Sequence, residues 1–118
     1  MNRGLSVVLA GGGGKTLWGM GVLDSIADLL PPVEHWAGVS AGAAMALIQV
    51  SGRIHASLDH VIARARANPR NFYPGRALRG GQAFPHEQMF RDSLHFVLAE
   101  GGWDQVRSGA PVHILLSY

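Results

Sequence analysis

The run Leu5-Ser-Val-Val-Leu-Ala-Gly-Gly-Gly-Gly-Lys15 decides the fold class of this chain of 118 residues. Its first five residues are apolar but for one serine, and they lead into a glycine run, as a buried strand of a parallel sheet does. From Leu17 to Leu30, apolar residues recur at intervals of three and four, which predicts a helix that Pro31 and Pro32 end. Strand, glycine loop and helix in this order indicate an α/β fold.

The same pattern then repeats further along the chain. His35 to Val39 is a second short strand candidate, and Ala41 to Val50 predicts a helix of small apolar residues that ends near Gly52. This alternation predicts a parallel sheet with right-handed crossovers, in which ligands bind beyond the carboxyl ends of the strands. A glycine-rich motif follows each of the two strands at that end.

The second half of the chain predicts two more helices and a third strand. The helices are expected at Ser57 to Ala67, with Ser57 as N-cap, and at His86 to Ala99, with a loop of proline, glycine and arginine from Asn68 to Pro85 between them. Pro111 to Tyr118 reads as a buried strand. Because three parallel strands leave open edges, we expect self-association or marginal stability of the isolated chain.

The turn after the second strand matches the pattern G-x-S-x-G, as Gly38-Val39-Ser40-Ala41-Gly42. In that pattern a serine sits on a sharp strand-to-helix turn, and the flanking glycines let backbones pass closely. The start of the following helix adds partial positive charge, which favours a developing alkoxide. The sequence therefore predicts Ser40 as a nucleophile. The alternative is a serine that only caps the helix and has no reactivity.

The glycine run after the first strand predicts an anion site formed by backbone amides. Its residues are Gly11, Gly12, Gly13, Gly14 and Lys15. A phosphate is one candidate anion, because Gly14-Lys15-Thr16 matches the end of a Walker A loop, but Leu9 stands where that motif requires glycine. A nucleotide-binding module is thus an alternative. The other candidate is the oxyanion of an acyl intermediate, which requires that the loop and Ser40 meet in space.

With these two motifs in this order, the chain resembles the patatin-like phospholipases. That family has a G-G-G-x-[KR]-G oxyanion loop after its first strand, a G-x-S-x-G elbow after the next, and a catalytic aspartate in a later D-G-[GA] motif. The resemblance implies that Gly12 and Gly13 offer amides to the oxyanion, that Lys15 is the basic residue of the loop, and that Ser40 attacks a lipid ester. Thr16 stands where the family has glycine.

The resemblance also implies an architecture: a three-layer α/β fold with a parallel sheet, of which residues 1–118 form one domain. No aspartate of this chain stands in a D-G-[GA] motif. We therefore expect the chain to be an incomplete, N-terminal portion of the patatin-like domain that stops before the base of the Ser/Asp dyad. An inactive interaction fragment is the alternative that follows from the missing base.

The amino-acid composition limits the classes of protein and of site that this chain can form. Apolar residues make up 47% and charged residues 15%, which is typical of a globular domain, and the absence of cysteine excludes disulfides and Cys/His zinc sites. No stretch resembles a signal peptide or is long enough to span a bilayer, so we expect a cytoplasmic protein. We expect no metal and no organic cofactor, because the six histidines show no paired spacing that is typical of a metal site or a catalytic base.

Charge is distributed unevenly along the chain. Between Arg53 and Arg79, six arginines face the single acidic residue Asp59. The arginines are Arg53, Arg64, Arg66, Arg70, Arg76 and Arg79. This pattern suits either a solvated helix face followed by a basic loop or a contact with anionic lipid headgroups. Aromatic residues are not interleaved with the arginines as a nucleic-acid platform requires, so we expect no nucleic-acid partner.

Overall fold

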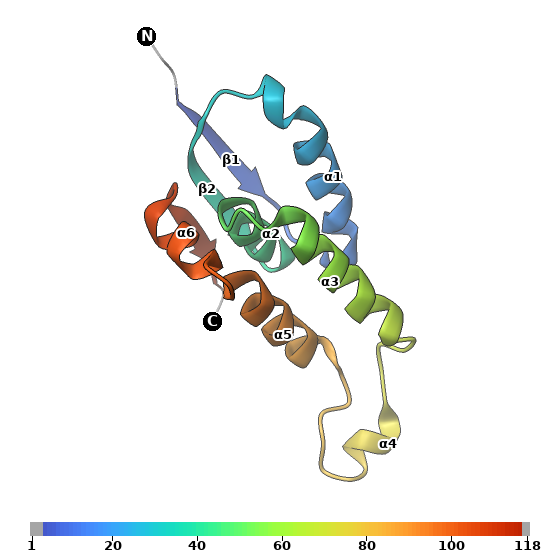
Figure 1. The fold of residues 1–118 in the computed structure, drawn as a ribbon. Helices are drawn as coiled ribbons and strands as arrows, with labels where there is room; N and C mark the ends of the chain where they lie inside the picture. The colour runs from blue at the N-terminus through green and yellow to red at the C-terminus, as the bar shows by residue number, and fades with distance from the viewer. Residues whose placement is uncertain (1–3, 117–118) are drawn as a thin grey trace.

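The structure is a computed structural model that describes residues 4–116 (Figure 1). In chain order its elements are β1 (Leu5–Leu9), the 3-10 helix η1 (Gly13–Thr16), α1 (Leu17–Ile26), the 3-10 helix η2 (Ala27–Leu29), β2 (Val33–Val39), α2 (Ala41–Val50), α3 (Ile54–Ala67), α4 (Pro74–Ala77), α5 (His86–Leu98), α6 (Gly102–Ser108) and β3 (Val112–Leu115). The bounds predicted for the first strand and for the helix after Ser40 are confirmed.

The three strands form one sheet in the order β1-β2-β3, and both pairs are parallel. Across the sheet, Val7 lies beside Trp36, which lies beside Val112. Side chains alternate between the two faces along each strand, so this row of apolar residues faces one side only. The parallel sheet that the sequence predicts is confirmed, and the strands that precede the two glycine motifs are neighbours.

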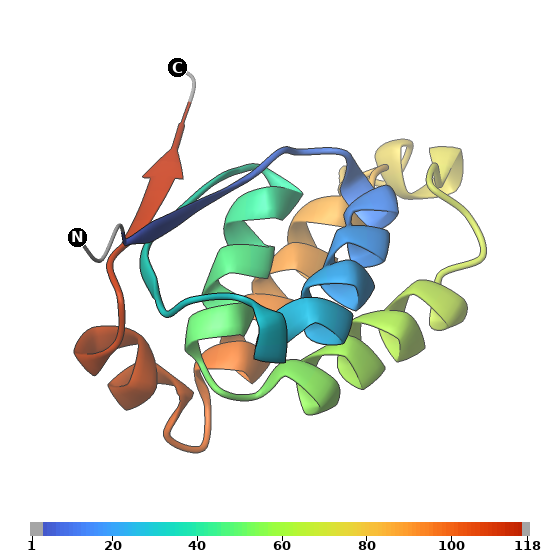
Figure 2. The same ribbon diagram turned by 90° about the horizontal axis from the view of Figure 1, so that it is seen from above.

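The helices gather on one face of this sheet (Figure 2). Helix α2 packs against all three strands, and α3, α5 and α6 pack against α2 in turn. The core lies where α1, α2 and α5 meet and consists of Met20, Met45, Ile48 and Val97; Leu9 of β1 and Leu17, Leu47, Ile54 and Leu58 of the helices pack against it. The stripe of small and apolar residues on α2 explains why this helix occupies the centre of the layer.

The other face of the sheet carries no helix within residues 4–116 (Figure 2). Val8 is 76% exposed there although it lies in a parallel strand, and Val39 and Leu115 are exposed as well. His35 and His113 lie side by side on the same face, with Nδ1 of the first 3.4 Å from Nε2 of the second. The α/β fold is confirmed, and the described residues form the sheet and one helical layer.

The expected N-cap at Ser57 is wrong. Helix α3 begins at Ile54, and Ser57 lies inside it, fully buried, with no hydrogen-bond partner for its hydroxyl. Ile54 and Leu58 both pack on the core, so the buried stripe begins one turn earlier than expected. Instead, the hydroxyl of Ser51 accepts a hydrogen bond of 3.2 Å from the Arg53 amide just before the helix.

Other elements also differ from the prediction: β2 begins at Val33 rather than His35, and the helix expected up to Leu30 is α1 to Ile26 followed by η2. The loop expected from Asn68 to Pro85 contains the short helix α4. The sequence did not predict α6, which begins directly after Gly101, a glycine in the left-handed conformation. The third strand spans Val112–Leu115. The predicted continuation to Ser117 and Tyr118 lies outside the described residues.

The segment from 68 to 85 projects from the body of the protein between α3 and α5 (Figure 1), and it is called the arm below. The molecule is elongated, with extents of 60 × 30 × 25 Å. Two hydrogen bonds of 2.8 Å fold the arm back on itself: the Tyr73 amide donates to the carbonyl of Ala83, and the Tyr73 hydroxyl donates to Oδ1 of Asn68. Within the described residues, no helix is both long and apolar enough to cross a membrane.

Candidate active site

Ser40 lies directly between β2 and α2 in a backbone conformation that side chains rarely adopt, with φ 54° and ψ −128°. Among residues 4–116 only one other non-glycine residue, Glu100, has a positive φ. Such a conformation costs about 1–3 kcal/mol and persists only where the surroundings impose it. The turn is therefore held by its neighbours, and Ser40 is left exposed to solvent.

The two flanking glycines show what holds the turn. A Cβ placed on Gly38 would lie 2.6 Å from the amide nitrogen of Ala43 in the first turn of α2. A Cβ on Gly42 would lie 2.6 Å from the carbonyl oxygen of Ala10, and it would clash with the carbonyl of Leu9. Real Cβ atoms do not approach backbone this closely. The glycines thus let α2 start hard against both β2 and the end of β1.

Ser40 occupies the N-cap position of α2, but its side chain makes no capping hydrogen bond. A serine that served only to cap the helix would accept a hydrogen bond from an amide of the first turn. Here the first turn is closed by backbone alone, with the Ala43 amide donating to the Ser40 carbonyl at 3.0 Å. The capping alternative therefore does not account for this serine.

The glycine loop, which follows β1, also approaches Ser40. A Cβ placed on Gly11 would lie 3.2 Å from Cβ and 3.8 Å from Oγ of Ser40. Gly12 and Gly13 both have positive φ, of 156° and 58°, and they turn the chain into η1. The first amides of a helix lack partners within it, so the amides at the start of η1 are candidate donors for an anion. The Lys15 amide, in contrast, donates to the Gly12 carbonyl at 3.3 Å.

Thr16 has a defined role where the family pattern has glycine. Its backbone is ordinary and helical, with φ −67° and ψ −20°, so the position needs no glycine here. Its hydroxyl donates a hydrogen bond of 2.7 Å to the carbonyl of Gly13. The side chain thereby stabilises the loop in its turned conformation.

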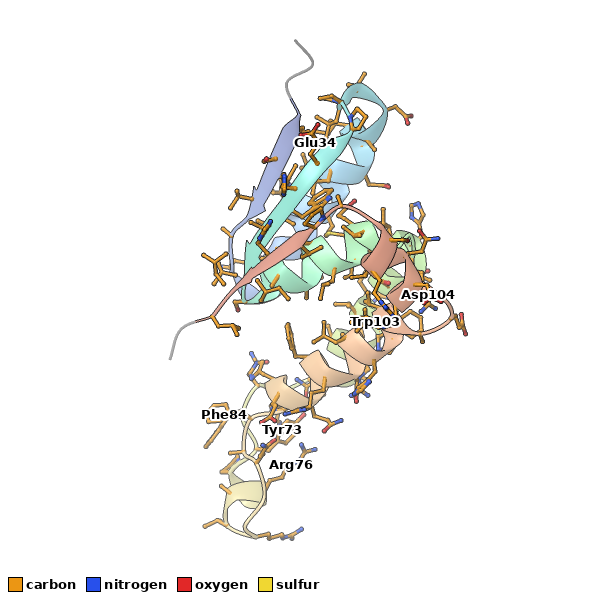
Figure 3. The ribbon with its side chains drawn as sticks, turned by 90° about the vertical axis from the view of Figure 1, so that its left-hand side faces the viewer. Glu34, Tyr73, Arg76, Phe84, Trp103 and Asp104 are labelled. Carbon is orange, nitrogen blue, oxygen red and sulfur yellow. The ribbon has the colours of Figure 1, made fainter. Side chains whose placement is uncertain are left out.

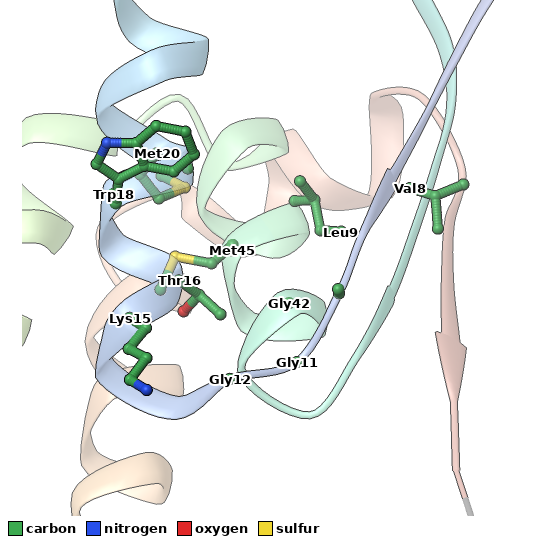
Figure 4. Close-up of a pocket in the computed structure, with 12 residues that line it drawn as sticks. Val8, Leu9, Gly11, Gly12, Lys15, Thr16, Trp18, Met20, Gly42 and Met45 are labelled. Carbon is green, nitrogen blue, oxygen red and sulfur yellow. The ribbon is translucent and has the colours of Figure 1, made fainter.

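A cavity of about 320 Å³ lies next to the glycine loop, between β1, α1 and α2 (Figure 4). Its walls are mainly apolar side chains and glycine backbone, from Val8, Leu9, Ala10, Gly11, Gly12, Lys15, Thr16, Trp18, Gly19, Met20, Gly42 and Met45. Figure 4 shows Val8 and Leu9 on opposite sides of β1. The cavity borders the loop and the elbow glycine, while the Ser40 side chain lies outside its lining.

The sequence did not identify three side chains of this cavity. Met20 and Met45 fall within predicted apolar helices, and Trp18 was not singled out, because periodicity does not separate a wall of a cavity from a core residue. Trp18 stands outside the apolar spacing of the predicted helix, and an aromatic residue there, directly after a glycine loop, is the sequence signal that could have pointed to a pocket.

The structure does not bring the six arginines together. Arg53 points into the body of the protein, where its guanidinium donates to the carbonyls of Phe96 and Ala99 and pairs with Glu100. Arg64 pairs with Asp92. These two arginines are thus engaged by groups of the protein itself, and whether the six arginines contact a membrane stays a prediction. Arg66, Arg70, Arg76 and Arg79 are exposed.

One carboxyl group has a shifted pKa. The side chains of Gln82 and Arg91 donate hydrogen bonds to Glu87, and with the charge of Arg91 they hold the pKa of this carboxyl below its ordinary value. Glu87 lies at the start of α5, where the arm returns to the body. No group of three or more histidine or acidic side chains that could hold a metal occurs within residues 4–116.

Comparison with known proteins bears on this arrangement of loop and elbow. The model of the family described as patatin-like phospholipase matches residues 7–114, which include both glycine motifs, all of β2 and most of β1 and β3. Searches of curated proteins and of solved structures found no match. A family match over nearly the whole chain is decisive for membership: the chain belongs to the patatin-like phospholipases.

Proposed function

We propose that this protein is a serine acyl hydrolase of lipid esters, with Ser40 as its nucleophile. The observation that carries the proposal is the approach of Gly11 to within a side chain's reach of a strained, exposed Ser40. Strained residues gather at functional sites, and here the strain serves no helix cap. Family membership supports a lipid ester as the substrate class.

In the proposed reaction, Oγ of Ser40 attacks the ester carbonyl carbon, and the C–O bond to the alcohol breaks. The Oγ proton passes to a base and from there to the departing alcohol. Water then cleaves the acyl-Ser40 ester, which releases the fatty acid and restores the hydroxyl. The family uses an aspartate as the base, and none of the five aspartates of this chain stands in the D-G-[GA] pattern. This chain's own contribution is therefore the nucleophile and the oxyanion loop.

The negative charge that develops on the carbonyl oxygen needs donors that are already in place. We assign this role to amides of Gly12 and Gly13, which follow Gly11 and turn the chain into η1. The Lys15 amide is engaged with the Gly12 carbonyl, so we assign Lys15 only its cationic side chain at the mouth of the loop. Each such donor contributes about 10² to 10³ in rate.

The cavity beside the loop suits the acyl chain of the substrate. Its side-chain walls at Leu9, Trp18, Met20 and Met45 are apolar, and it opens next to Gly11 and Gly42, which border the elbow. A fatty acyl chain seated there would leave its carbonyl near the loop amides. No observation on the described residues favours the nucleotide alternative over this one.

The test is reaction with a fluorescent fluorophosphonate, which phosphonylates activated serines. The wild-type chain should be labelled, and Ser40→Ala should lose the label. Ser25→Ala is the matched control, because Ser25 is also exposed but lies on α1 with its hydroxyl bound to the Gly21 carbonyl. Unlabelled wild-type protein, or equal labelling of Ser40→Ala, would reject Ser40 as the nucleophile.

A further inference from the structure

The arm exposes large apolar side chains that a folded protein in water normally buries. Leu78 is 89% exposed at the end of α4, and Phe72 and Phe84 are 50% and 59% exposed on the two limbs of the arm. The two phenylalanine rings lie 5.2 Å apart, so they form one apolar surface. Grouped apolar exposure of this kind marks a surface that meets another apolar phase or partner.

The charge of the arm has a single sign. From residue 60 to residue 86 the chain contains five arginines and no acidic residue. Four of these arginines, Arg66, Arg70, Arg76 and Arg79, are exposed, and only Arg64 is paired with an acid. The partner that complements this surface is therefore anionic.

The arm is ordered by its own contacts before any partner binds. Besides the two bonds made by Tyr73, the Arg76 guanidinium lies 4.3 Å from the centre of the Tyr73 ring, and the Gly81 amide donates to the Arg76 carbonyl at 2.8 Å. Figure 3 shows Tyr73, Arg76 and Phe84 grouped on the arm. A preformed tip loses little conformational entropy on binding.

The direction of the arm relates it to the candidate active site. In Figures 1 and 3, β1 and β2 run toward the end of the molecule from which the arm projects. Ser40 and the glycine loop follow the carboxyl ends of these strands. A flat anionic surface bound by the arm would thus face the edge of the sheet that carries the loop and the serine.

From these observations we propose that the arm docks the protein on anionic lipid bilayers. Leu78, Phe72 and Phe84 enter the interface, while the arginines on the arm contact lipid phosphates. A bilayer fits better than a polyanion such as nucleic acid, because a polyanion uses the arginines but gives an aliphatic side chain like Leu78 no apolar phase to enter. This docking does not depend on the chemistry proposed for Ser40.

The contribution of the arginines to membrane binding is tested by cosedimentation of the protein with phosphatidylcholine vesicles that contain a minority of phosphatidylglycerol. Each arginine near such a surface contributes about a fivefold increase in partitioning at low ionic strength, so replacing Arg70, Arg76 and Arg79 together by glutamine should weaken binding about 100-fold. Arg107→Gln, at an exposed arginine of α6, is the matched control and should bind as the wild type does. Pure phosphatidylcholine should bind the wild type far more weakly.

Insertion is tested with a polarity-sensitive fluorophore on a single cysteine, since the chain has none of its own. The fluorophore at Leu78→Cys should shift to the blue and brighten when anionic vesicles are added. At Leu29→Cys, a matched position that is 81% exposed in η2, it should not change. Leu78→Ser should lower partitioning about tenfold, through loss of buried apolar area.

Several outcomes would overturn the docking proposal. They are equal binding to neutral and anionic vesicles, a response of the probe at position 29 rather than 78, or binding to soluble polyglutamate or DNA without binding to vesicles. Ser40→Ala should partition like the wild type, so the two proposals fail separately. Loss of fluorophosphonate labelling with intact vesicle binding rejects only the nucleophile, and the reverse result rejects only the arm.

Discussion

Replacing Ser40 by glycine should make the protein more stable than replacing it by alanine. Both substitutions remove the hydroxyl, so in the folded protein they differ mainly in how easily the new residue adopts φ 54° and ψ −128°. Alanine retains a strain of about 1–3 kcal/mol at such a position, and glycine releases it. Glycine in turn stabilises the unfolded chain by about 0.4–1 kcal/mol through its greater conformational entropy.

The net difference in the free energy of unfolding is thus about 1 kcal/mol in favour of Ser40→Gly. Unfolding entropy near 2.1 cal/mol/K per residue converts this into a melting temperature about 4 °C higher than that of Ser40→Ala. The measurement is thermal unfolding followed by circular dichroism, with urea unfolding as a second determination. Neither variant should react with a fluorophosphonate.

Ala41→Gly is the matched control one residue further along. Ala41 opens α2 with the helix's ordinary geometry, so glycine there should lower stability by about 0.5–1 kcal/mol. The two neighbouring positions should therefore respond to glycine with opposite signs. A Ser40→Gly protein that is no more stable than Ser40→Ala would refute the idea that the fold holds a strained elbow.

Three further predictions concern other contacts. Gly42→Ala should destabilise the protein by about 1–3 kcal/mol, measured by urea unfolding, because the added methyl group would force α2 away from β1. Arg53→Met should cost about 2–3 kcal/mol in the same assay, since the side chain is only 15% exposed and holds carbonyls at the end of α5; an effect below half of this would show that the bonds are not maintained. In an NMR titration Glu87 should have a pKa below the ordinary glutamate range, and Arg91→Gln should raise it, because the cation that favours the carboxylate is gone; an unchanged pKa in that variant would contradict the assigned cause.

Sharp changes in composition made parts of the fold predictable from sequence. β1 ends at a glycine run, and α2 lies between a glycine-flanked serine and a serine-glycine turn, so both bounds were found correctly. The close approach of the two glycine motifs in space also followed from the rule that parallel strands joined by a short crossover lie side by side. The packing of Gly11 against Ser40 is the contact that this rule implied.

The remaining features depend on tertiary contacts that a local pattern does not contain. Ser57 has the residue type of an N-cap but lies inside α3, because Ile54 meets the core one turn earlier. Arg53 reads as a surface charge, yet carbonyls from α5, more than forty residues away, bind it. Helix α6 begins after a left-handed glycine and buries only Gly102, so it shows no strong apolar stripe.

The central claim is that the glycine loop and the Ser40 hydroxyl act on one carbonyl group. It is tested most directly by the rate at which a fluorophosphonate labels Gly11→Val, whose side chain would fill the space between the loop and Ser40. The control is Gly21→Val on α1, where a Cβ meets nothing within 4 Å. The account predicts labelling of Ser40 about 10² to 10³ times slower in Gly11→Val and near the wild-type rate in Gly21→Val. Equal rates in all three proteins, each shown to be folded, would contradict it.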